Sequence, residues 1–160
     1  MREDRTPRQL EHRRAALEHV VAHATALRTV LHDLRRSALD TAAFDVATST
    51  YEFHRAQLTQ WIYGKAVHEY YEDDYNAQFH LCIGLEYAER GSALIDELRE
   101  LARSLADAQH EAAQDADSVE LSYLRIDSLG DHNVLFDEVE VVLRRFDDYC
   151  LATELLNEGD

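Results

Sequence analysis

Two histidines four residues apart are the first feature of this sequence with metal-binding potential. His19 and His23 would share one face of a helix, a spacing at which two imidazole rings can chelate one ion. The surrounding apolar pattern turns His19 outward and puts His23 at the margin of the buried stripe, which favours a solvated or half-buried pair. His80 and Cys82 are two residues apart and would project from different sides of a helix, so as a local pair they form only a weak metal motif.

Motifs of enzyme active sites are missing from the sequence. A di-iron carboxylate bundle needs Glu-x-x-His on two helices, and the nearest approach is Asp107 followed three residues later by His110. His110-Glu111 does not continue into HExxH, and the chain has no G-x-S-x-G elbow and no glycine-rich phosphate loop. We therefore expect no enzymatic function and keep a ferritin-like metal-binding bundle as an alternative.

Large aromatic residues cluster in the middle of the chain. Trp61, Tyr63, Tyr70 and Tyr71 carry rings that combine an apolar body with a polar tip, which suits a partner interface or the mouth of a pocket. The alternative is that Trp61 packs in the core and that the tyrosines cap it.

The same segment resembles a known signature. Residues 56–64, Ala-Gln-Leu-Thr-Gln-Trp-Ile-Tyr-Gly, resemble the C-x-L-G-x-W-[LI]-Y-G motif of chemoreceptor zinc-binding domains. Ala56 stands at the Cys position and Thr59 at the first Gly position, and the family's H-x-x-x-H on the third helix has no counterpart. The resemblance implies a cytoplasmic, commonly dimeric helical bundle that senses zinc through three His and one Cys.

A zinc site is a hypothesis that follows from this resemblance. His23 lies at about the separation expected for the family's first His ligand. A rearranged site would recruit His54, His80 and Cys82, which supply the nitrogen and sulfur donors that Zn²⁺ prefers. These four residues lie on three predicted helices, so their convergence depends on how the helices are rotated.

Heptad spacing predicts the elements that position these residues. Leu10, Leu17, Ala24, Leu31 and Ala38 recur every seven residues, with Val20, Leu27 and Leu34 between them. This stripe belongs to the core of one chain or, in part, to a dimer interface. On the third helix the apolar face is expected to include Phe79, Ile83, Tyr87, Leu94 and Leu98. The predicted fold is an all-α, up-and-down antiparallel bundle of three long helices and a short one in a single domain, 1–160. The helix ranges expected from the pattern are about 7–39, 45–64, 74–113, 118–129 and 132–156, with 118–129 as the short helix.

Composition limits the partners and the location. A formal charge of −16 repels nucleic acid and anionic membranes, and it favours a basic protein partner. The chain has no apolar run long enough to span a membrane, and its charged N-terminus does not match a signal peptide. The two cysteines form no CxxC motif, so we expect reduced thiols and a cytoplasmic location.

The resulting hypothesis is a non-enzymatic regulatory or protein-interaction bundle, with a protein partner that includes a second copy of the chain as one option. A degenerate zinc-sensing role with Zn as cofactor is its finer form. Two rival hypotheses stand beside it: the ferritin-like metal-binding bundle, and an acidic protein that mimics DNA and sequesters a DNA-binding partner.

Overall fold

The structure is a computed structural model, and the residues it describes are 6–36, 41–64, 67–68, 71–72, 74–114 and 118–158, with side chains described outside 112–132 and 157–158. This part of the chain contains four helices and no strand, which confirms the predicted all-α class. The helices are α1 (Pro7–Arg36), α2 (Thr41–Ile62), α4 (Tyr75–Gln114) and α5 (Ser118–Glu158). None of the described helices combines the length and the apolar composition that a membrane crossing needs.

Side-chain caps fix the start of two helices. The Thr6 hydroxyl accepts the backbone N–H of Gln9 at 3.2 Å, while the Gln9 side-chain oxygen accepts the N–H of Thr6 at 2.9 Å. This reciprocal pair is a capping box at the start of α1. At α4, an Asp74 carboxylate oxygen accepts the N–H of Ala77 at 3.1 Å and so caps the first turn of the helix.

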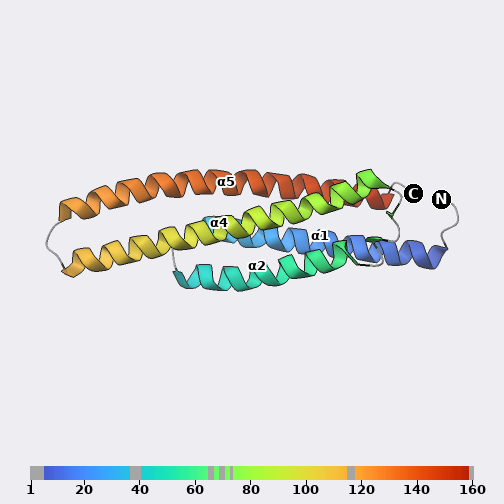
Figure 1. The fold of residues 1–160 in the computed structure, drawn as a ribbon, viewed down its shortest axis with the longest axis horizontal. Coiled ribbons are helices and arrows are strands. Elements are labelled where there is room, and N and C mark those ends of the chain that lie inside the picture. The colour runs from blue at the N-terminus through green and yellow to red at the C-terminus, as the bar shows by residue number, and fades with distance from the viewer. Residues whose placement is uncertain are drawn as a thin grey trace.

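The four helices run in alternating directions and form an antiparallel bundle (Figure 1). Each helix packs mainly against two neighbours, α1 against α2 and α5, and α4 against α2 and α5, with a smaller contact between α1 and α4. α1 begins and α5 ends at the same end of the bundle. With 40 and 41 residues, α4 and α5 are about 60 Å long, and they continue past the far ends of the shorter α1 and α2 (Figure 1).

From Leu17 to Leu34 the heptad stripe of α1 lies in the core of the single chain, whereas Leu10 is half-buried and Ala38 lies outside the described residues. Leu17 and Leu31 are 1% and 0% exposed, and the alternating positions Val20, Leu27 and Leu34 are equally buried. The buried part of the stripe is therefore covered by α2, α4 and α5, so it belongs to the core of one chain. It is not free to serve as a dimer interface.

The buried face of α4 differs from the predicted one. Phe79, predicted to lie inside, is 70% exposed, while Ile83 and Tyr87 are only half-buried. The predicted Leu94 and Leu98 are buried as expected. The buried positions recur mostly at spacings of four and three residues: Ala77, Leu81, Gly84, Ala88, Gly91, Leu94, Ile95, Leu98 and Ala102. Small residues occupy much of this seam because two large side chains from neighbouring helices fill the space beside it. Tyr51 of α2 reaches Gly91, and Tyr149 of α5 reaches Gly84.

The last helix is also longer than predicted. The prediction ends a short helix at 129, before Gly130, yet α5 runs unbroken from Ser118 to Glu158. A glycine inside a helix costs only about 1 kcal/mol relative to alanine, so it permits a stop without requiring one. The separate predicted ranges 118–129 and 132–156 are therefore one helix, and of the four described helices α2 is the shortest at 22 residues.

Candidate functional site

Two of the predicted metal donors meet between α1 and α2. The Nδ1 atom of His23 lies 3.1 Å from the Nδ1 atom of His54, so one nitrogen donates a proton and the other accepts it. Two imidazolium cations cannot form this contact, because both nitrogens would then be donors. Burial lowers the pKa of His23 below its ordinary value, and the neighbouring His54 and His19 lower it further.

Aromatic rings extend this pair in both directions along the α1–α2 contact. His19 stacks on Trp61 with ring centres 4.1 Å apart and planes 2° apart, and it stands 6.4 Å from His23. On the other side, Phe53 meets His54 edge-on at 5.2 Å. The α1–α2 ring cluster (His19, His23, His54, Phe53 and Trp61) thus joins a half-buried Trp61 to the histidine pair. One face of the Trp61 ring is covered by His19, so only part of the predicted interface residue is open.

The other two predicted donors lie between different helices. The Nε2 atom of His80 is 3.2 Å from the Thr153 hydroxyl, which itself donates to the backbone oxygen of Tyr149 at 2.8 Å. His80 Nε2 therefore carries a proton and donates it to Thr153. The His80 ring also stacks on Tyr149 at 5.0 Å, and burial lowers the His80 pKa. Cys82 is half-buried against the core, and its thiol is free.

The predicted zinc site is accordingly split between two places. A structural Zn²⁺ needs four donors in a tetrahedron. The structure brings His23 and His54 together, whereas His80 points to Thr153 on α5. Among the described residues, no three His, Cys, Asp or Glu side chains are close enough to hold one metal ion. These residues therefore do not fit a closed zinc site. The ferritin-like pair, Asp107 and His110, is exposed on α4 and forms no such group either.

The predicted aromatic interface is divided as well. Tyr63 is 64% exposed at the end of α2 and is available to a partner. Tyr71 is 3% exposed and belongs to the core, so its ring is not open to a partner in this structure. The backbone N–H of Tyr71 donates to the Val67 oxygen at 3.2 Å, and both side chains belong to the core where the chain passes from α2 to α4. Tyr70 lies outside the described residues.

An exposed apolar set on α4 and α5 was not predicted. Tyr75 and Phe79 are one helical turn apart on α4 and are 80% and 70% exposed. Leu151 and Leu155 have the same spacing on α5 and are 59% and 57% exposed. We call these four residues the α4–α5 patch. The signal that could have revealed it is the glycine and alanine heptad of α4, which places Phe79 on the side opposite the core.

Comparison of the chain with protein-family models, with curated proteins and with solved structures finds no match. Function must therefore be inferred from the geometry of the described residues.

Proposed function

We propose that this protein is a non-enzymatic interaction bundle with a regulatory role, which binds another protein through the α4–α5 patch. The single observation that carries this proposal is the exposure of large apolar side chains on two adjacent helices. Isolated exposed apolar residues are ordinary on protein surfaces, whereas a group of them is typical of an interaction site.

The contacts between α4 and α5 support the grouping of these residues. His80 lies beside Thr153, and the two helices are antiparallel, so the positions just before 80 face those just after 153. Phe79 and Leu155 are therefore at the same level of the bundle. Phe79 also lies midway between the buried Ala77 and Leu81, so its ring projects away from the core.

The hydrogen bonds of the polar side chains in the core indicate that these side chains have a structural role. The Tyr51 hydroxyl donates to the backbone oxygen of Ala88, and the Tyr149 hydroxyl donates to that of Leu81. His80 donates to Thr153, as described above. Because these groups form hydrogen bonds within the protein, they hold the helices together and do not require a substrate as a hydrogen-bond partner.

The partner is expected to be a basic protein in the cytoplasm. The net charge of −16 favours cationic partners, and the free thiols of Cys82 and Cys150 suit a reducing compartment. A second copy of the chain carries the same negative charge and is disfavoured by it.

Site-specific photocrosslinking tests this proposal. A benzophenone amino acid placed at Phe79 or Leu151 should capture a discrete partner in cells, which mass spectrometry would identify. The matched control is Val46 of α2, which is 68% exposed but lies outside the patch. Capture of the same partner by the Val46 probe, or capture that survives Tyr75→Glu combined with Leu155→Glu, would refute a binding role for the patch.

A further inference from the structure

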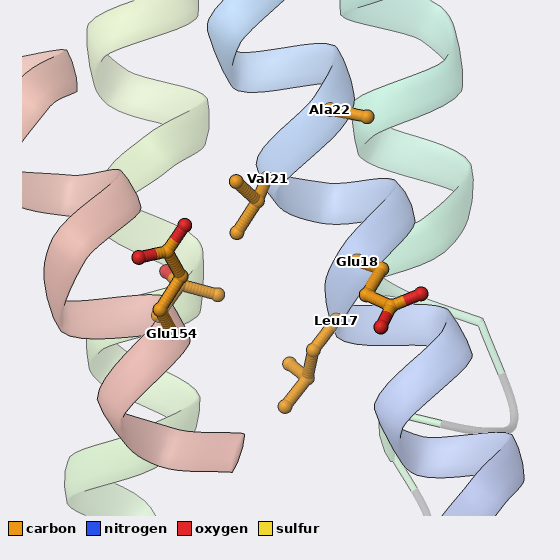
Figure 2. A pocket seen from close by; sticks show the side chains of 6 residues that line it. Leu17, Glu18, Val21, Ala22 and Glu154 are labelled. Carbon is orange, nitrogen blue, oxygen red and sulfur yellow. The ribbon is translucent and has the colours of Figure 1, made fainter. Parts of the chain in front are cut away.

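A second surface lies on a different pair of helices, between α1 and α5. A hollow with a volume of about 200 Å³ opens there near the end of the bundle where α5 finishes. Figure 2 shows Leu17 and Val21 reaching from α1 toward α5, from which Glu154 extends. The residues that line the hollow are Leu17, Glu18, Val21, Ala22, Thr153 and Glu154.

The floor of this hollow is apolar and has no hydrogen-bonding capacity to offer. Leu17 is 1% exposed and Thr153 is 0% exposed. The Thr153 hydroxyl donates its proton to the Tyr149 backbone oxygen and accepts a hydrogen bond from His80, and because the residue is fully buried it is not open to a ligand. A polar ligand group would lose its water at this floor and gain no partner, which costs free energy. The group that enters must therefore be apolar.

The volume of the hollow suits a single side chain better than a drug-sized ligand or a cofactor. Pockets for drug-sized ligands and cofactors usually measure about 300–1,000 Å³. The present hollow is smaller and suits one leucine- or phenylalanine-sized group. Apolar anchors that fill single pockets are the usual energetic centre of a protein interface.

Carboxylates stand on both sides of the hollow. Glu154 extends from α5 at one side, and Glu18 leaves α1 on the side away from α5 (Figure 2). Both residues are exposed. Arg28 lies further along the same two helices, and its guanidinium is paired with Asp147 at 2.5 Å, so its charge is offset. If a partner carries a cation on each side of its apolar anchor, one cation can pair with Glu18 and the other with Glu154.

The geometry points to a docking site for a partner segment that carries one apolar anchor residue with lysine or arginine on both sides. The anchor fills the hollow over Leu17 and Val21, and the flanking cations pair with Glu18 and Glu154. This inference does not rest on the α4–α5 patch, because it uses a different pair of helices and different residues.

A fluorescein-labelled helical peptide tests the inference. A length of about 15 residues gives a helix of about 22 Å, which places a residue one turn before and one turn after the central anchor. The peptide has a central leucine with lysines one turn before and after it, and its binding to the full chain is measured by fluorescence anisotropy. Two matched peptides replace either the lysines by glutamate or the leucine by alanine. We expect the lysine–leucine peptide to bind at least about tenfold more tightly than either control, because each control lacks one of the two contributions.

Variants of the chain locate the binding. Val21→Trp fills the hollow and should abolish binding while circular dichroism remains helical. Glu18→Gln combined with Glu154→Gln should weaken binding about tenfold, whereas the exposed Glu86→Gln on α4 should leave it unchanged. Methyl NMR signals of Leu17 and Val21 should shift when the peptide is added to the unaltered protein.

Several results would overturn the inference. Equal binding of the glutamate peptide or of the alanine peptide would show that either the cations or the anchor are irrelevant. Full binding to the Val21→Trp variant would place the peptide elsewhere. If Phe79→Glu removed that binding, the α4–α5 patch would be the true surface, and the proposed function would survive while this inference failed.

Discussion

The ring of Tyr149 occupies the space beside Gly84 that any side chain at position 84 would need. A Cβ atom built on Gly84 would lie 2.4 Å from Tyr149 Cζ, a distance that such atoms essentially never show. The Tyr149 hydroxyl then donates to the Leu81 oxygen at 2.9 Å. One heptad further on, Tyr51 of α2 repeats the arrangement at Gly91. α4 is therefore held from two sides by tyrosines that need glycine opposite them.

This packing reverses the expected effect of a glycine-to-alanine substitution on the free energy of unfolding. Gly→Ala inside a helix normally stabilises it by up to about 1 kcal/mol. Gly84→Ala should instead lower the free energy of unfolding by about 1–3 kcal/mol, because the methyl group collides with a fully buried ring. Urea unfolding followed by circular dichroism measures the change.

A double-mutant cycle assigns the cause of that loss. Replacing Tyr149 by Leu removes the ring, so Gly84→Ala should be far less damaging in the Tyr149→Leu background. Equal losses in both backgrounds would mean that the ring is not the obstacle.

The second prediction concerns the α1 stripe. Leu31 is fully buried in a single chain, so Leu31→Asp should remove the helical signal by placing a charge in the core. The exposed Leu151→Asp is the matched control and should keep full helicity. A helical Leu31→Asp protein whose mass by light scattering falls from dimer to monomer would return the stripe to a dimer interface.

Much of this fold can be predicted from the sequence because its signals are local. The Thr6–Gln9 capping box and the Asp74 cap follow from residues three positions apart, and the α1 stripe repeats bulky apolar residues at heptad spacing. The face of α4 could not be read in the same way. Its seam contains Gly84 and Gly91, whose burial depends on tyrosines supplied by other helices.

The candidate site was predictable only in part for the same reason. His23 and His54 come from separate helices, and sequence could propose both as donors without showing that they meet. His80 turns to Thr153 because of the rotation of α4 and α5, which no local pattern encodes. The α4–α5 patch became visible only after the true seam of α4 was known.

The third prediction is that zinc does not stabilise the fold. Stabilisation by a ligand requires binding to the folded state, and the described residues gather only two of the four donors of a closed site. Melting temperatures with equimolar zinc and with chelator should agree within about 1 °C. A larger rise that disappears in both His23→Ala and Cys82→Ser would reinstate the four-donor site. The exposed His12→Ala serves as the control.

The fourth prediction concerns salt. The chain has 32 acidic residues and 16 basic ones, and the excess negative charges repel one another across the narrow bundle. Salt screens this repulsion, since the Debye length falls from about 30 Å at 0.01 M to about 10 Å at 0.1 M. The melting temperature should therefore rise with sodium chloride over this range. A flat or falling response would show that the interhelical ion pairs, such as Arg28–Asp147, outweigh the repulsion.

The last prediction is a loss of stability as the pH falls through the window from about 6.5 to 5.5. Burial, together with His54 and His19, lowers the pKa of His23 in the folded chain below 6.5, and burial also lowers that of His80. The unfolded chain then binds more protons than the folded chain below pH 6.5, so stability is full above that pH and falls as the solution is acidified. Carboxylates titrate mainly near pH 4 and contribute little in this window. Thermal melts across the window should show a falling melting temperature, and the slope should be smaller in His23→Asn and in His80→Asn. His12→Asn, at an exposed position, should keep the slope of the unaltered protein. If the melting temperature rises on acidification, or if neither variant changes the slope, the buried histidines are not the groups that set the pH response.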